Sequence, residues 1–353
     1  MPRETMNIRQ NVPLAPLTTL GVGGNARFFG EAASLDDVEA AVRFAQDRNL
    51  RLFVLGGGSN LVISDQGWDG LVIKLGIDQI EPRPAGDQVV FEVGAGADWD
   101  SFVAHCVSQD CAGVECLSGI PGSVGGTPVQ NVGAYGQEVS QTILSVEVFD
   151  VAEKKVRNLS AADCGFRYRT SIFNSTERGR FIIVRVRYRL TPGQGPALLY
   201  ADLQKHFAGQ HHPPTLAQTR DAVRSIRARK GMLIHPGDPD SRSAGSFFKN
   251  PVLSSAERTE LMRRASARGL EVPSYPALEQ QHKVSAAWLV EHSGLRKGYV
   301  KGNAAISSKH ALALINRGGA TASEIIALKD EIQGAVSDTW GIGLEAEPVF
   351  VGF

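Results

Sequence analysis

The spacing of apolar residues predicts amphipathic helices in the first half of the chain. Val38, Val42 and Ala45 fall on one helical face behind Ser34. Serine is a favoured helix N-cap because its hydroxyl accepts a hydrogen bond from a first-turn N–H. A second helix is predicted over Ala97–Gln109, where apolar residues again gather on one face.

Shorter apolar runs predict strands between and after these helices. Ile143–Phe149 and Phe181–Leu190 alternate apolar and polar residues, which is typical of antiparallel strands with one exposed face. Further strands are predicted over Leu52–Leu55, Gly70–Leu75 and Val89–Val93.

Beyond Thr191–Pro196, a run of turn residues, the pattern becomes mainly helical. The predicted helices are Gln218–Lys230, Ser255–Gly269, Ala286–His292, Lys309–Asn316 and one that begins at Thr321 or Ser323 and runs through Val336. The chain closes in an apparent strand. Arg220, Arg224 and Arg227 share one face of the first of these helices, and such a basic face is most often solvated. The whole pattern predicts a mixed α+β fold.

Composition narrows the class of protein. The 353 residues are 42% hydrophobic and 21% charged, with a formal charge of zero, so a nucleic-acid binder with a broad basic surface is not expected. The first 16 residues lack the apolar core of a secretory signal, so we expect a cytoplasmic protein. Cys106, Cys111, Cys116 and Cys164 lack the spacing of a metal pair, and neither a metal site nor a disulfide is predicted.

Ser118–Glu138 is the most unusual stretch, with six glycines and two prolines among 21 residues. Each interior glycine disfavours a helix by about 1 kcal/mol and each proline by about 3 kcal/mol. The stretch is either a compact structural loop or a wall of backbone N–H groups against a large ligand. Gly125 and Gly126 would then let the backbone approach that ligand closely.

A second glycine-rich turn, LGGGSNLVI over Leu55–Ile63, follows a strand and runs into another strand. It lacks the Gly-Lys-Ser/Thr of a Walker loop and the following helix of a Rossmann fingerprint. Successive N–H groups in such a turn form an anion-binding nest, although a tight hairpin bend remains the alternative.

Three polar residues in apolar surroundings are chemical candidates. Ser246 lies in AGSFFKNP but not in the G-x-S-x-G elbow of a serine hydrolase. Arg169 lies among aromatic residues in FRYRTS, where it must be paired or face an anion. Glu347 precedes an apolar terminal segment and is either salt-bridged or functional.

Together, GIPGSVGGTPVQNVGAYGQE, LGGGSNLVI, FRYRTS, GSFFKNP and LEAE resemble the UDP-N-acetylenolpyruvoylglucosamine reductase family, and Tyr200 in LLYADL resembles its tyrosine-loop subgroup. The resemblance implies an FAD-binding region of the vanillyl-alcohol-oxidase type, made of two α+β subdomains, and a C-terminal substrate-binding α+β domain. It implies reduction of UDP-N-acetylenolpyruvoylglucosamine to UDP-N-acetylmuramate with NADPH, in peptidoglycan precursor synthesis. Flavin N5 would deliver hydride to substrate C3.

The resemblance also implies roles for individual residues. Ser246 would donate the proton to C2, while Arg169 and Glu347 would stabilise the enolate-like intermediate. The residues expected to bind FAD are Leu55, Gly56, Gly57, Gly58, Ser59, Asn60, Leu61, Gly119, Ile120, Pro121, Gly122, Ser123, Val124, Gly125, Gly126, Asn131, Gly133, Ala134 and Tyr135. Those expected to bind substrate are Tyr168, Tyr200, Lys230, Asn250 and His310.

The expected domains are residues 1–70 and 71–196 for FAD and 197–353 for substrate, with the last strand, about 343–353, returning to the active site. A monomer without membrane insertion is expected. Two alternatives remain: another flavin oxidoreductase of the same fold, and a nucleotide-sugar binding protein without catalytic activity.

Overall fold

The computed structural model describes residues 6–276 and 281–353. They form two units that are each discontinuous in sequence. The first unit holds the chain up to Pro13, Asn25–Gly58 and Trp68–Ala228, and the second holds Leu14–Gly24, Ser59–Gly67 and Arg229–Phe353.

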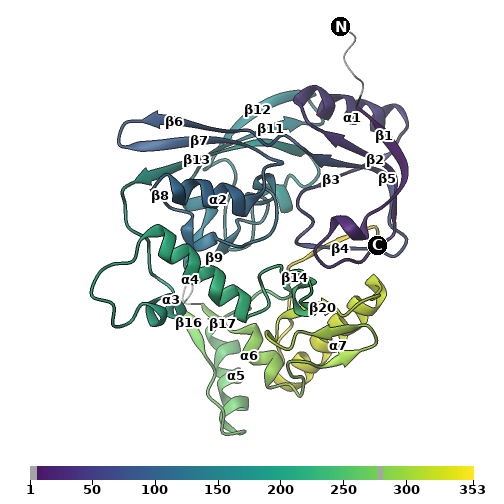
Figure 1. The fold of residues 1–353 in the computed structure, drawn as a ribbon. Helices are drawn as coiled ribbons and strands as arrows, with labels where there is room; N and C mark the ends of the chain where they lie inside the picture. Colours follow the sequence, from purple (N-terminus) through teal and green to yellow (C-terminus); the bar gives the residue numbers. More distant parts are fainter. Residues whose placement is uncertain (1–5, 277–280) are drawn as a thin grey trace. The chain divides into compact units, whose positions relative to one another are not determined.

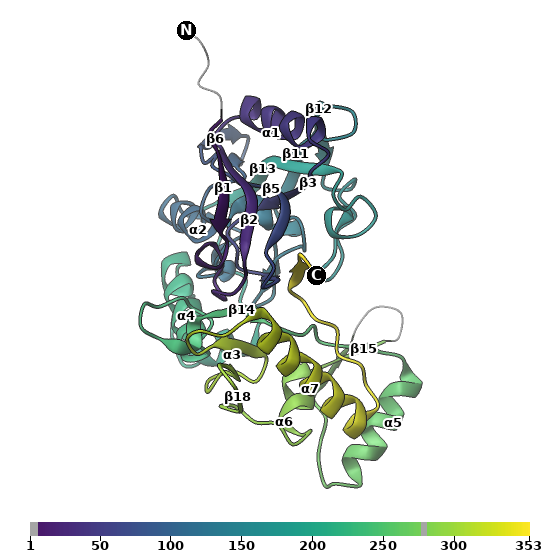
Figure 2. The same ribbon diagram turned by 90° about the vertical axis from the view of Figure 1, so that its right-hand side faces the viewer.

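The first unit contains a four-stranded sheet in the order β1-β2-β5-β3. Its strands are β1 (Ile8–Pro13), β2 (Asn25–Ala32), β5 (Trp68–Leu75) and β3 (Arg51–Leu55). β5 runs parallel to both β2 and β3, while β1 is antiparallel to β2. Helix α1 (Leu35–Asp47) packs on these strands with Val38, Val42 and Ala45 buried, and Ser34 caps it as predicted (Figure 2).

A larger antiparallel sheet of the same unit has the order β12-β11-β13-β7-β6, with β8 paired to β13. Its strands are β6 (Ile80–Ala85), β7 (Gln88–Gly94), β8 (Cys111–Ala112), β11 (Ile143–Asp150), β12 (Lys155–Ser160) and β13 (Phe181–Pro192). Helix α2 (Trp99–Ser108) lies beside β7 and β13, where Phe102 contacts both Phe91 and Tyr188 (Figure 1). These buried aromatic rings form much of the core of this unit.

The glycine-rich stretch Ser118–Glu138 has little regular structure, as its composition requires. It contains the 3₁₀ turn η3 (Val124–Gly126) and a small hairpin of β9 (Gly133–Ala134) and β10 (Gln137–Glu138). Two helices follow the large sheet, α3 (Ala201–His206) and α4 (Leu216–Arg229).

The second unit is built on the sheet β14-β20-β19-β18 and the smaller sheet β15-β17-β16. Helix α7 (Ala322–Trp340) packs on β19 and β20 and on α6 (Ala286–Glu291), and it ends at the left-handed Gly341. The remaining elements are β4 (Leu61–Ile63), β14 (Ser243–Ser246), β15 (Val252–Leu253), α5 (Ser255–Ser266), β16 (Ser274–Pro276), β17 (His282–Val284), β18 (Val300–Lys301), β19 (Ala304–Ile306), β20 (Ala313–Asn316) and β21 (Val349–Val351).

One predicted helix is wrong. Lys309–Asn316 contains no helical residue; its second half is β20, which pairs with both β14 and β19. All four residues of β20 are buried. A short apolar run buried on every side fits a helix or a central strand equally well.

Candidate functional site

Gly57 and Gly122, one glycine from each of the two segments predicted to bind a ligand, lie against each other in the first unit. A Cβ atom on Gly57 would come within 2.4 Å of the Cα of Gly122. Position 57 therefore requires glycine, because any side chain there would meet main-chain atoms. Gly58 and Gly122 also have φ values of 64° and 137°, which favour glycine. The structure therefore brings the backbone groups of both segments to one place.

Gly125 and Gly126 have different surroundings. A Cβ on Gly125 would lie 2.6 Å from the Cβ of Ala95, so glycine is required there for packing inside the protein. At Gly126 the nearest atom is Ser123 Oγ, 3.9 Å away, which leaves open space beside an exposed backbone. At Gly125 the contact with Ala95 by itself requires glycine, and the expectation that both glycines leave room for a ligand stays a prediction.

The arginine face of α4 is not a solvated face, contrary to the prediction from its spacing. Arg220 donates two hydrogen bonds to the Asp100 carboxylate, at 2.5 and 2.9 Å, and Arg224 donates to the same group. Asp100 Oδ1 also accepts the N–H of Gly119 at 2.6 Å, and Arg227 donates to the Gly119 carbonyl at 3.0 Å. Both backbone polar groups of Gly119, its N–H and its C=O, are thus held by charged side chains.

These contacts oppose the effect of burial on the carboxylate. Burial alone would raise the pKa of Asp100, but the hydrogen bonds from Arg220 and Gly119 and the arginine charges lower it below its ordinary value. Asp100 is therefore an anion over the neutral range. Nothing in the sequence pairs it with α4, which lies about 120 residues further along the chain.

The β9–β10 hairpin presents Tyr135 at its tip. Tyr135 and Gly136 occupy its two-residue turn with φ values of 50° and 88°, the combination found in type I′ turns. The ring of Tyr135 lies edge-to-face with that of Tyr200, with centroids 5.3 Å apart. The predicted cofactor residue Tyr135 and the predicted substrate residue Tyr200 are therefore neighbours.

Arg169 occupies a tight turn of its own. Arg167 and Thr170 exchange backbone hydrogen bonds around it, and Arg169 has a φ of 55°, which is unusual for a residue with a side chain. Its guanidinium donates to the Gly133 carbonyl at 2.9 Å and lies 5.3 Å from the ring centre of Tyr168. The structure thus joins the two predicted site residues Arg169 and Gly133 directly.

Ser246 and Glu347 come together in the second unit. Ser246 ends β14 opposite Ala313 of β20, and the next residue, Phe247, accepts the N–H of Glu347 at 2.9 Å. Asn60 donates its side-chain amide to the Glu347 carbonyl at 3.3 Å. The final strand is shorter than predicted, since β21 begins two residues after Glu347 and pairs in parallel with β4.

Two expected substrate residues of this unit, His310 and Asn250, form side-chain hydrogen bonds with the backbone. The N–H of Leu312 donates to Nδ1 of His310 at 3.1 Å, so the neutral ring carries its proton on Nε2. Burial and the charges of Lys230 and Lys297 lower the pKa of His310 to about 4. Asn250 uses its side-chain oxygen to accept the N–H of Ala286, the first residue of α6.

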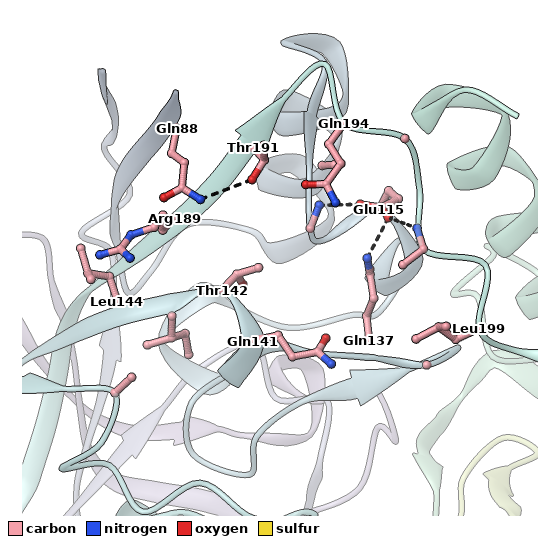
Figure 3. Close-up of a pocket in the computed structure, with 17 residues that line it drawn as sticks. Gln88, Glu115, Gln137, Gln141, Thr142, Leu144, Arg189, Thr191, Gln194 and Leu199 are labelled. Carbon is pink, nitrogen blue, oxygen red and sulfur yellow. Dashed lines mark hydrogen bonds between the residues drawn. The ribbon is translucent and has the colours of Figure 1, made fainter. Parts of the chain in front are cut away.

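A polar cavity of about 600 Å³ lies elsewhere in the first unit (Figure 3). Gln137 and the buried Glu115 line it, and the Gln137 amide donates to Glu115 at 2.7 Å. Glu115 also accepts the N–H groups of Gly113 and Ala197. Glu115 therefore connects Gly113, just before the glycine-rich stretch, with Ala197, three residues before Tyr200.

The remaining sequence expectations concern metals, disulfides and membranes. In residues 6–276 and 281–353 no three or more His, Cys, Asp or Glu side chains gather in a way that would hold a metal ion. All four cysteines are buried free thiols, and burial raises the pKa of both Cys116 and Cys164 to about 12. Among the described residues, no helix is both long and apolar enough to span a bilayer.

Comparison with known proteins identifies the class of the site. Residues 26–160 match the model of an FAD binding domain, and residues 238–351 match that of the UDP-N-acetylenolpyruvoylglucosamine reductase C-terminal domain. The UDP-N-acetylenolpyruvoylglucosamine reductase of Thermobifida fusca is 48% identical over 99% of both chains, and that of Streptomyces coelicolor is 44% identical over 99% of this chain and 91% of the relative.

A solved structure gives the same likeness. The UDP-N-acetylenolpyruvylglucosamine reductase of Thermus caldophilus is 27% identical, with a TM-score of 0.67 over 98% of this chain and 99% of that one. The mixed α+β fold with an FAD-binding region of the vanillyl-alcohol-oxidase type, expected from the sequence, is confirmed.

Proposed function

Because this chain belongs to the UDP-N-acetylenolpyruvoylglucosamine reductase family, we propose that it reduces UDP-N-acetylenolpyruvoylglucosamine to UDP-N-acetylmuramate, with FAD bound and NADPH as the reductant. The reaction is a step in the synthesis of peptidoglycan precursors. The observation that carries the proposal is the contact of Gly57 with Gly122, in a region that matches an FAD binding domain.

The local structure fits a flavin dinucleotide. The backbone of two glycine segments converges there, and a Cβ at Gly126 would enter open space rather than protein. N–H groups in such turns bind phosphate oxygens without help from a helix dipole. The residues proposed to hold FAD are Leu55–Leu61, Gly119–Gly126 and Gly133–Tyr135, with the backbone of Asn131 included by family resemblance.

Three side chains are proposed to carry the chemistry. When bound, the flavin supplies the two-electron step, taking reducing equivalents from NADPH and passing them to C3 of the enolpyruvyl group. Electron density then develops at C2 beside the substrate carboxylate, where Arg169 would stabilise it and Glu347 would assist. The hydroxyl of Ser246 would donate the proton to C2. Serine is a weak acid, so it can protonate C2 only because the carbon is strongly basic at that stage.

The remaining proposals concern substrate binding. His310, with its proton on Nε2, would donate a hydrogen bond to the nucleotide-diphosphate part without adding charge. Lys230 would add a positive charge, while Tyr168 and Asn250 complete the expected set. Tyr200, in contact with Tyr135, supports assignment to the tyrosine-loop subgroup.

Other expectations stay proposals. They are the division into domains at residues 70 and 196, the monomeric state, the cytoplasmic location and the preference for NADPH. Equal rates of flavin reduction by NADH and NADPH would contradict the last of these.

The two half-reactions test the proposed function. Ser246→Ala should leave bleaching of the flavin by NADPH intact and slow its reoxidation by the enolpyruvyl substrate about a hundredfold or more, because only the second half needs the proton. Stopped-flow absorbance of the flavin measures both. An equal loss in both halves would make Ser246 structural. A wild-type protein inert towards the enolpyruvyl substrate would favour another flavin oxidoreductase or an inactive nucleotide-sugar binder.

A further inference from the structure

Both amide hydrogens and the oxygen of Asn131 take part in hydrogen bonds inside the protein. Asn131 is 1% exposed, and its amide nitrogen donates to Glu138 Oε2 at 2.8 Å and to the Arg167 carbonyl at 3.1 Å. Its oxygen accepts the N–H of Ser140 at 3.1 Å. Both amide hydrogens are therefore engaged, which leaves the side chain no donor for a cofactor.

The partners of Asn131 belong to two different segments. Glu138 is on β10, directly opposite Gly133 of β9, and Arg167 begins the tight turn that carries Arg169. The carboxylate of Glu138 can only accept hydrogen bonds when ionised, so it fixes which end of the Asn131 amide points towards the Arg167 carbonyl.

Two more hydrogen bonds join the same segments. Ser171 Oγ donates to the Val129 carbonyl at 2.6 Å, and the guanidinium of Arg169 donates to the Gly133 carbonyl at 2.9 Å. The turn of Arg169 is thus attached to residues 129–138 at three points. Gly133 has no room for a side chain, because a Cβ there would lie 2.8 Å from Glu138 Cγ and 3.3 Å from the Arg169 guanidinium.

The backbone of this region is held in conformations that residues with side chains rarely adopt. Asn131, Tyr135 and Arg169 have φ values of 45°, 50° and 55°. Such a conformation is strained in a residue with a side chain and persists only where the surrounding contacts enforce it. At Asn131 and Arg169 those contacts are the hydrogen bonds between the two segments.

We propose that Glu138 and Asn131 form a clamp that positions the guanidinium of Arg169 for the reaction, and that Asn131 does not bind the cofactor through its side chain. Glu138 orients the amide, the amide holds the turn at Arg167, and the turn directs Arg169 to the Gly133 carbonyl. The inference rests on the proposed role of Arg169 in stabilising charge on the substrate. Both clamp residues are positioning residues.

Asn131→Gly is the decisive variant because glycine accepts the left-handed backbone and removes only the side chain. Reoxidation of the reduced enzyme by the enolpyruvyl substrate should slow by about tenfold to a hundredfold, as expected when a reacting group is misplaced by about 1 Å. FAD affinity, measured by fluorescence titration, and reduction by NADPH should stay close to wild type. Asn49→Gly makes the same change at an exposed left-handed residue, φ 50°, and should alter none of these.

Glu138 provides a second route if Asn131→Gly folds poorly. Glu138→Ala should slow reoxidation selectively, and Glu138→Gln should recover most of the rate, since its amide oxygen still accepts a hydrogen bond from Asn131. A loss of FAD affinity in Asn131→Gly, with both half-reactions slowed together, would overturn the clamp and restore Asn131 as a cofactor ligand. Unchanged reoxidation in both Asn131→Gly and Glu138→Ala would overturn it as well.

Arg169→Ala separates this inference from the proposed function. If Arg169→Ala reoxidises at the wild-type rate, the role of Arg169 is wrong and the proposed function must be revised. If Arg169→Ala is slow while Asn131→Gly is fast, only the clamp is wrong.

Discussion

At the scale of single residues, His310, a proposed substrate-binding residue, links the stability of the fold to pH. Its ordinary pKa of 6.5 falls to about 4 in the folded protein, because of burial and the charges of Lys230 and Lys297. Below about pH 6.5 the His310 ring is therefore protonated in the unfolded chain while it stays neutral in the folded chain. Stability should be fully present above that pH and should fall as the pH drops towards 4.

His310→Gln tests this linkage because glutamine does not titrate. Urea unfolding of both proteins at a series of pH values should give a constant difference in unfolding free energy above about pH 6.5. Below it the wild type should lose stability faster than the variant. Parallel curves down to pH 4 would show that His310 is not the group responsible.

The contacts of the candidate residues could not be predicted from the sequence. Ser246 and Glu347 were found as polar residues in apolar surroundings, and the structure joins their segments through Phe247. Asn131 was expected to extend the ligand wall, but its partner Glu138 lies opposite Gly133 in a hairpin that spacing alone does not define. The sequence distinguishes Glu138 only as the single charged residue of Ser118–Glu138 and does not indicate its partner.

At the scale of elements, the adjacent glycines of η3 should respond differently to substitution. Gly125→Ala places a methyl group against Ala95 and should destabilise the protein by about 1–3 kcal/mol through overpacking. Gly126→Val should weaken FAD binding by about tenfold or more, which is about 1.4 kcal/mol, with little change in the stability of the apoprotein. Thermal unfolding and FAD titration separate the two effects. Loss of stability in Gly126→Val without loss of FAD affinity would contradict the assignment.

The ion pairs between Asp100 and the arginines of α4 should contribute to stability. Asp100→Asn removes the charge held by Arg220 and Arg224, and it should lower the free energy of unfolding by about 1.5–3 kcal/mol, the range for hydrogen bonds to charged groups. Because the pKa of Asp100 is lowered, this contribution should be present above its ordinary pKa of 3.8 and disappear as the pH falls further.

The matched control is an ion pair on the surface. Asp69 pairs with Arg27 at 3.2 Å, but both side chains are more than half exposed. Asp69→Asn should therefore change stability by less than about 1 kcal/mol in urea unfolding. Equal effects of the two substitutions would mean that the α4 network is a surface feature after all.

Elements with a clear period were predicted correctly, and so was the buried strand Gly70–Leu75, but the buried run that forms β20 was not. α1, α2 and the antiparallel pair β11–β13 follow from one-sided apolar patterns. β20 was mistaken for a helix because burial on all sides removes the period. The face of α4 was read as solvated because its partner, Asp100, lies on α2, far away in sequence.

At the scale of the whole molecule, chain order and spatial order differ in ways that local patterns do not reveal. The second unit includes Leu14–Gly24 and Ser59–Gly67, so segments from the first quarter of the chain complete it. The parallel pairing of β4 with β21 joins Leu61–Ile63 to the last residues of the chain. Such long-range pairing depends on three-dimensional packing, and the return of the final segment to the active site, expected only from the family resemblance, stays a prediction.

Binding of FAD should stabilise the folded protein as a whole. A ligand that binds only the folded state stabilises it by RT ln(1 + [L]/Kd), which is about 2.7 kcal/mol when free FAD is at 100 times its Kd. The purified protein should be yellow, and after removal of the flavin its thermal midpoint should rise with added FAD. In Gly126→Val the same rise should need a higher FAD concentration, because the binding surface and not the fold is altered. A colourless protein whose midpoint does not respond to FAD would refute the flavin site.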